Sequence, residues 1–334
     1  MQQQIPESFL ETAPPLRANL PAVTGARHVR TDEDAVERVA SWLAYEEFVM
    51  PGQGLEPVAG SSAGDREHRI DVAMLMNTLN FAFTDFASGR KFEVVRGGRT
   101  YSDSEAMFVC VEEALHDGIP MTDGAWMADV TPSDLDRIFA GSITMPMLEE
   151  RAQVLNEVGT TLRDAYGGRF SRFIDDCPPR LYDSGSGLLE RLLVEFPRFN
   201  DVSPYDGHTI RLYKLAQLGL WSMHATGLVV LEDLHRMTAF ADYIVPVALR
   251  LFGVFEYSPE LDVRINAGDL IPRDSTEEVE IRAHSLHATA LLTEAVNRRR
   301  PEGTRLVIPQ LDYRLWKSYH ATTWPHHLTR TVMY

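Results

Sequence analysis

Apolar residues recur at helical spacing along most of the chain. Within residues 147–166 the apolar side chains fall three or four positions apart, which places them on one face of a helix. Thr31 and Thr131 are positioned to open two other helices. The same periodicity predicts helices over residues 188–196, 209–224, 238–252 and 275–297. The sequence therefore predicts a mainly α-helical protein.

One short β-hairpin is predicted within this helical pattern. Phe92 and Val94 precede the pair Gly97-Gly98, and Tyr101 follows it. A glycine pair supplies the positive φ angles of a tight turn. We therefore expect a hairpin near residues 91–101 and only helices in the part of the chain that follows it.

Proline and glycine indicate the domain organisation. Pro14, Pro15 and Pro21 predict an extended N-terminal arm over residues 1–25, and glycine and serine residues make residues 51–65 a loop. No linker rich in proline, glycine or serine divides the middle of the chain. We therefore predict a single helical domain over residues 26–334.

Charge restricts the classes of partner. The 334 residues are 44% hydrophobic and 24% charged, as in ordinary globular proteins, and the formal net charge is −16. Such acidity argues against direct nucleic-acid binding, because that requires clustered Lys and Arg. A mononucleotide, by contrast, needs only one local basic pocket.

Other features of the composition bear on the compartment. Cys110 and Cys177 are too few for a disulfide framework, and the N-terminus lacks the pattern of a signal peptide. No segment is apolar enough for a membrane span. We therefore expect a cytoplasmic protein without a membrane partner. The oligomeric state is left open, and a monomer is compatible with the sequence.

An acidic residue, Asp242, interrupts the apolar face of the helix predicted over residues 238–252. Pro246 cannot donate a hydrogen bond to the Asp242 carbonyl, so it would kink the helix at that turn. A carboxylate beside such a break is a candidate catalytic group with a pKa tuned by burial. The alternative is a solvent-facing side chain or a structural ion pair.

Arg211, Lys214 and Gln217 share one face of the helix predicted over residues 209–224. Two cations and an amide on that face could hold one phosphate group. The alternative is an ordinary solvated helix face.

Two patterns near the C-terminus carry weaker candidates. Glu280, His284 and His287 share a helix face as metal ligands can, but the HExxH signature is missing. Asp312 and Trp316, in the run 306–316, could hydrogen-bond and stack on a base, or could be core residues with one polar handle. No dinucleotide, P-loop or serine-hydrolase motif is present.

A series of motifs resembles those of the queuosine salvage proteins, also called queuosine 5′-phosphate N-glycosylases. The resemblance extends along nearly the whole chain from about Ala26, and the motifs agree in order and spacing. They are residues 77–83 (NTLNFAF), 98–102 (GRTYS), 117–122 (DGIPMT), 145–151 (MPMLEER), 155–157 (LNE), 213–217 (YKLAQ), 237–243 (MTAFADY), 278–283 (EVEIRA) and 311–316 (LDYRLW).

This resemblance implies a fold similar to the helical DNA glycosylases. It also implies an activity that splits queuosine 5′-monophosphate into queuine and ribose 5-phosphate, without a metal or organic cofactor. The family pattern places the catalytic carboxylate at Asp242 and the phosphate-binding cation at Lys214. A carboxylate there could stabilise an oxocarbenium-like state, bind covalently or orient water. Glu280 and Asp312 are candidates for the acid that protonates the departing base.

The motifs that carry the resemblance also supply further candidates for contact with the substrate. These are Asn80, Tyr101, Phe240, Tyr243, Glu280, Arg282, Asp312 and Trp316.

The chain departs from the family pattern at several positions. Ile244 and Val247 stand where the family usually has Arg and Gln, Thr84 replaces a Trp, and Lys317 replaces an acidic residue. These changes leave the identity of the base open. A divergent member that cleaves a different base is one alternative, and a protein that binds a nucleotide or base without cleaving it is another. A third is a metal hydrolase that uses His284 and His287.

Overall fold

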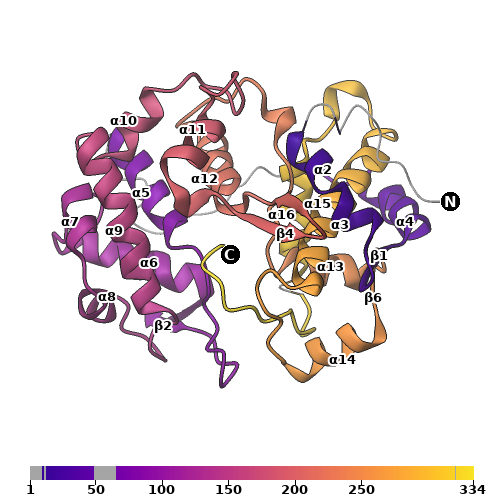
Figure 1. Cartoon of the computed structure of the whole chain (residues 1–334), viewed down its shortest axis with the longest axis horizontal. Helices are drawn as coiled ribbons and strands as arrows, with labels where there is room; N and C mark the ends of the chain where they lie inside the picture. The colour runs from indigo at the N-terminus through magenta and orange to yellow at the C-terminus, as the bar shows by residue number, and fades with distance from the viewer. Residues whose placement is uncertain (1–9, 11–12, 49–64, 320) are drawn as a thin grey trace. The chain divides into compact units, whose positions relative to one another are not determined.

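The computed structural model describes residues 10, 13–48, 65–319 and 321–334, which are mainly helical (Figure 1). The chain divides into two compact units. The first comprises the described residues of 1–53, 201–217 and 233–330, and the second those of 54–200, 218–232 and 331–334. The single domain expected over residues 26–334 remains a prediction. The loop predicted over residues 51–65 lies outside the described residues except for Asp65.

The first unit is built around the long helix α15 (Thr276–Asn297), which is buried along most of its length. Apolar side chains of α4 (Glu33–Leu43) and α13 (Val245–Leu251) pack with it in one core cluster. The unit also contains α2 (Pro14–Ala18), α3 (Leu20–Thr24), η2 (Leu234–Arg236), α14 (Pro259–Ala267), η3 (Glu302–Thr304), α16 (Ile308–Tyr319) and the strands β1 (Val29–Thr31), β4 (Val202–Tyr205), β5 (His208–Arg211) and β6 (Phe255–Tyr257). Helix α12 (Lys214–Ala225) begins in this unit.

The second unit packs the 18-residue helix α9 (Leu148–Ala165) against the short helix α7 (Gly124–Asp129). Its other elements are α5 (Arg66–Thr78), β2 (Glu93–Arg96), β3 (Arg99–Ser102), α6 (Asp103–His116), α8 (Pro132–Ile138), α10 (Phe170–Asp175), α11 (Leu188–Glu195) and η1 (Pro197–Phe199). The fully buried Arg151 donates to the carbonyls of Leu79, Phe81 and Ala82, which satisfies a charge that burial would otherwise make costly.

The predicted hairpin is confirmed, since β2 and β3 pair antiparallel with Val94 opposite Tyr101. The expectation that only helices follow it is wrong. Strands β4 and β5 form a second hairpin, and β1 pairs with β6. The β4–β5 turn uses Asp206 at φ 44° and Gly207 at φ 81°, the conformation that the Asp-Gly pair favours in tight hairpins.

Two other expectations need correction. Residues 14–24 are not an extended arm, because α2 and α3 form there and bury Leu16 and Ala22. Their prolines lie in the first turn of each helix, where the missing N–H has no helical partner to lose. Thr31 ends β1, and Asp32 caps the helix that follows it.

Candidate functional site

Asp242 precedes a helix instead of lying within one. Helix α13 begins at Val245, and Pro246 occupies its first turn, where it causes no kink. Oδ1 of Asp242 accepts hydrogen bonds from the backbone N–H groups of Ile244 at 2.8 Å and Val245 at 3.0 Å. The helix predicted over residues 238–252 is therefore too long, and the carboxylate is fixed at the N-terminal end of α13.

Lys214 is the first residue of α12, and the helix predicted to start at residue 209 is wrong at that end. Arg211 lies in β5 and is exposed, so it does not share a helix face with Lys214. Gln217 is fully buried and hydrogen-bonds Thr238 through both its amide oxygen and its amide nitrogen. This amide therefore holds the loop before Asp242 instead of facing a phosphate.

Asp312 lies on α16, and its Oδ1 accepts a hydrogen bond of 2.9 Å from the backbone N–H of Phe240. Asp242, Asp312 and Lys214 are all buried, with 8%, 4% and 6% of their surface exposed. Lys214 and Asp242, which lie 98 and 70 positions before Asp312 in the chain, thus meet it within the first unit.

The three groups interact electrostatically. Burial raises the pKa of Asp242, while Lys214 and the two backbone N–H groups oppose that rise. Burial and then the neighbouring Asp242 raise the pKa of Asp312 well above its ordinary value, against the smaller effects of the Phe240 N–H and Lys214. The difference in environment favours one ionised carboxylate, Asp242, beside one protonated carboxyl group, Asp312.

Arg282 lies behind this cluster, and its side chain has no exposed surface. Its Nε donates to the carbonyl of Ala241 at 3.0 Å, and its two terminal nitrogens donate to Asp201. Asp201 is a residue that the sequence did not nominate. No motif marks it, although a buried arginine requires a carboxylate partner from somewhere in the chain.

Glu280 makes contacts away from these groups. Its carboxylate accepts hydrogen bonds from the backbone N–H groups of Arg27 and His28 and from the hydroxyl group of Tyr205. His284 pairs with Thr31, and His287 pairs with the carbonyl of Leu16. Within the residues that the structure describes, no three His, Cys, Asp or Glu side chains gather as metal ligands could.

Three predicted aromatic residues, Phe240, Tyr243 and Trp316, lie close in the chain to Asp242 or Asp312. The rings of Tyr243 and His326 lie with their centroids 4.4 Å apart and their planes tilted by 33°, and Phe240, two residues before Asp242, is buried. Trp316 stacks on Tyr313 along α16. His326 was not predicted, because no local pattern links the C-terminal segment to Tyr243.

Two predicted contact residues lie in the second unit. Asn80 is half-buried after α5, and Tyr101 is a half-buried residue of β3 whose ring lies 4.6 Å from the guanidinium carbon of Arg99.

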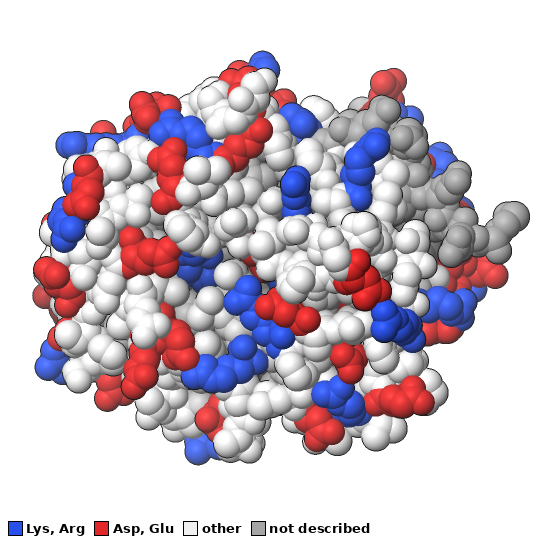
Figure 2. Space-filling model, viewed as in Figure 1, with Lys and Arg blue, Asp and Glu red and all other residues white. Residues whose placement is uncertain are grey.

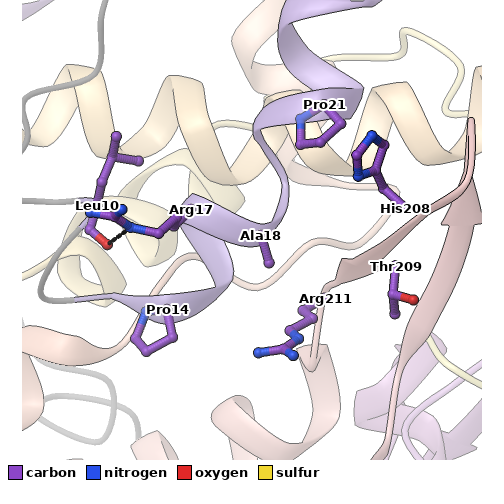
Figure 3. Close-up of a pocket in the computed structure, with 8 residues that line it drawn as sticks. All are labelled: Leu10, Pro14, Arg17, Ala18, Pro21, His208, Thr209 and Arg211. Carbon is purple, nitrogen blue, oxygen red and sulfur yellow. Dashed lines mark hydrogen bonds between the residues drawn. The ribbon is translucent and has the colours of Figure 1, made fainter.

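A pocket of about 740 Å³ lies elsewhere on the first unit (Figure 3). Arg17, His208 and Arg211 line it, together with residues of α2, α3 and β5. Asp242, Asp312 and Lys214 do not line this pocket, so the predicted site and the pocket involve different side chains.

In the face shown in Figure 2, Lys and Arg side chains lie interspersed with Asp and Glu. In the described part of the chain, every helix is too short or too polar to cross a membrane.

Comparison with known proteins gives consistent matches. The family model described as queuosine salvage protein matches residues 61–334. A queuosine 5′-phosphate N-glycosylase/hydrolase of Sphaerobacter thermophilus is 33% identical over 319 residues, covering 93% of this chain and 95% of that protein. Proteins of the same name from Bos taurus and Mus musculus are 31% and 29% identical, covering 87% and 92% of this chain and 88% and 95% of their own lengths.

Proposed function

This chain belongs to the queuosine salvage protein family, and we propose that it hydrolyses the N-glycosidic bond of queuosine 5′-phosphate, releasing queuine and ribose 5-phosphate. The observation that carries the proposal is the buried grouping of Asp242, Asp312 and Lys214. A carboxylate, a protonated carboxyl group and a cation are the groups that this reaction requires. The relatives named for this activity support the choice of substrate.

Asp242 is proposed to act on the sugar. As the bond between the anomeric carbon and the base nitrogen breaks, positive charge develops on the ribose ring. A fixed carboxylate stabilises that charge, and the N–H groups of Ile244 and Val245 hold this one in place. Water then adds to the anomeric carbon to give ribose 5-phosphate.

Asp312 is proposed to act on the base. Burial and the neighbouring Asp242 raise its pKa well above the ordinary value, which favours the protonated form that a general acid requires. The proton moves to the departing nitrogen, and a proton from the attacking water restores the acid. Of the two candidates, Asp312 is preferred over Glu280, because Asp242 and Lys214 both affect its pKa while Glu280 is bonded to Arg27, His28 and Tyr205.

Lys214 is proposed to bind the 5′-phosphate. Its position at the start of α12, close to both carboxyl groups, supports a role in holding an anionic substrate. Binding a remote phosphate also positions the scissile bond. We also propose that the substrate is contacted by Asn80, Tyr101, Phe240, Tyr243 and Trp316.

The fold is proposed to be similar to that of the helical DNA glycosylases, and the mainly helical structure supports this proposal.

The base accepted is the least constrained part of this proposal. Ile244 and Val247, at positions where the family usually has Arg and Gln, are both buried apolar residues near the N-terminus of α13. Thr84 is also buried. A base other than queuine, cleaved by the same groups, is the alternative that these positions favour.

Mass spectrometry tests the function directly. Purified protein is incubated with queuosine 5′-monophosphate, and free queuine is measured against a sample without enzyme. Release of queuine supports the proposal. Tight binding of the nucleotide without release at high enzyme concentration contradicts it and supports a binding protein. Guanosine 5′-monophosphate in the same assay tests a different base.

A further inference from the structure

Asp201 and Arg282 form a buried ion pair between the segments that carry Lys214 and Asp242. Nη1 of Arg282 donates to Oδ1 of Asp201 at 3.2 Å, and Nη2 donates to Oδ2. The Arg282 side chain is 0% exposed, and the Asp201 side chain is 2% exposed. Two-point pairing of a planar guanidinium with a carboxylate fixes orientation as well as distance.

Asp201 holds the backbone that leads into Lys214. Its carbonyl oxygen accepts from the N–H groups of Leu212 at 3.0 Å and Tyr213 at 3.2 Å, and its Oδ2 accepts from the N–H of Lys214 at 3.5 Å. Tyr213 has a φ of 50°, a left-handed conformation that a bulky residue keeps only where its surroundings impose it. The contacts from Asp201 impose it here.

Arg282 holds the loop that carries Asp242. Its Nε donates to the carbonyl of Ala241 at 3.0 Å, one residue before the proposed catalytic carboxylate. Its Nη1 also donates to Glu278 at 3.3 Å, one turn earlier on α15. The Arg282 guanidinium is therefore bonded to Asp201, which holds the backbone before Lys214, and to the carbonyl of Ala241, which precedes Asp242.

We propose that Asp201 and Arg282 are positioning residues that set the separation between Lys214 and Asp242. The inference rests on the proposed function. Phosphate binding accelerates cleavage only if the anomeric carbon is then held correctly against the carboxylate, and small errors in that distance are costly. The motif resemblance made Arg282 a candidate for contact with the substrate, but its side chain has no exposed surface, and in this proposal it acts through Asp201 and Ala241.

Two conservative variants test this inference. Asp201→Glu keeps the charge but lengthens the side chain, and Arg282→Lys keeps the charge but loses the fork of donors. The quantity measured is the ratio of kcat/KM for queuosine 5′-monophosphate to that for queuosine, with enzyme in excess. We expect the ratio to fall about tenfold or more in both variants, mainly through kcat for the nucleotide. Only the nucleotide has a phosphate for Lys214 to bind, so only its cleavage depends on the separation between Lys214 and Asp242.

Loss of folded protein does not produce this result. It lowers kcat/KM for both substrates by the same factor and leaves the ratio unchanged, so partly unfolded preparations still give an answer. Arg264→Lys is the matched control. Arg264 lies on α14 and pairs with Glu277, which is on α15 as Arg282 is, but it has no bond to Asp201.

Two outcomes overturn the inference in distinguishable ways. An unchanged ratio in both variants, together with a lower ratio in Lys214→Ala, contradicts the positioning role and leaves the proposed function intact. Absence of base release from either substrate by the wild-type protein contradicts the proposed function and the positioning role with it.

Discussion

At the scale of single residues, the chemistry depends on how neighbouring groups separate the pKa values of two carboxyl groups, both of which burial raises. Asp242 faces Lys214 and two backbone N–H groups, all of which favour its ionised form. Asp312 accepts one backbone hydrogen bond and lies beside the charge of Asp242, which disfavours its ionisation. Neighbouring groups with opposed environments can divide the base-like and acid roles between them.

The pH dependence of the reaction tests the role of Asp312. An acid must be protonated, so the wild-type rate is expected to fall as pH rises through the raised pKa of the carboxyl pair. Asp312→Asn is expected to lower kcat by about 100-fold or more and to remove that alkaline decline. A pH–rate profile for both proteins provides the measurement, and an unchanged alkaline limb in the variant removes Asp312 from the role of acid.

The anchoring role of Lys214 predicts a difference between substrates. Lys214→Ala is expected to reduce kcat/KM for the nucleotide about 100-fold more than for the nucleoside, equivalent to about 2.7 kcal/mol. Both substrates lose some rate, because the same cation also faces the carboxyl groups. Arg211→Ala, which removes an exposed cation, is the control and is expected to change neither. Equal losses for both substrates contradict a phosphate contact.

The sequence could nominate Asp242 and Lys214 but could not establish their geometry. The motif resemblance selected the two residues, and the structure brings both together with Asp312. Asp201 and His326 were missed because their partners lie far away in the chain and neither residue belongs to a local pattern. Contacts of this kind depend on tertiary packing.

At the scale of elements, local patterns predicted long helices well and their ends less well. The regular apolar spacing of α9 and α15 gave helices close to the expected bounds, and Thr131 caps α8 as expected, in a capping box with Asp134. The apolar residues 238–244 resemble helix by spacing, but side-chain bonds from Gln217 and Asp312 hold them in an irregular loop. The Asp206-Gly207 turn was a local signal that the periodicity obscured.

The contact of α7 with α9 predicts an effect on stability. A Cβ atom at Gly159 would lie 2.5 Å from both the backbone nitrogen of Ala128 and the Cβ of Met127. Gly159→Ala is therefore expected to lower the free energy of unfolding by about 1–3 kcal/mol. Gly303→Ala is the control, since nothing lies within 4 Å of its added Cβ. Equal denaturation midpoints for the two variants would show that the helices separate at little cost.

At the scale of the whole molecule, the chain passes repeatedly between two compact units. Helix α12 itself begins in one unit and ends in the other, so no linker composition marks the division. Both units bury polar and charged groups, and each depends on hydrogen bonds between distant segments. The sequence could therefore predict a large helical protein but not how the chain divides.

Buried histidines make the stability depend on pH. Burial lowers the pKa of His287 to about 3 and that of His284 to about 4, whereas an unfolded chain titrates near 6.5. The unfolded state therefore binds more protons, and the stability present above about pH 6.5 is lost as pH falls towards about 4. Each histidine contributes a slope of up to about 1.4 kcal/mol per pH unit in that range.

A variant isolates one of these contributions. His287→Gln keeps a donor for the carbonyl of Leu16 but cannot take up a proton, so the slope between pH 6 and 4.5 is expected to become shallower by up to about 1.4 kcal/mol per pH unit. Denaturant unfolding at several pH values provides the measurement. His116→Gln, at a side chain that is 89% exposed, is the control. Identical slopes in the two variants would contradict a neutral buried imidazole at His287.

The central claim is that the Asp242 carboxylate promotes cleavage of the glycosidic bond. The most direct test is the single-turnover rate of queuine release from queuosine 5′-monophosphate by the wild-type protein and by Asp242→Asn, which can still accept hydrogen bonds from Ile244 and Val245. The account predicts a folded variant that binds the nucleotide and releases base about 1,000-fold more slowly or worse. A rate within a few-fold of the wild-type value would contradict it.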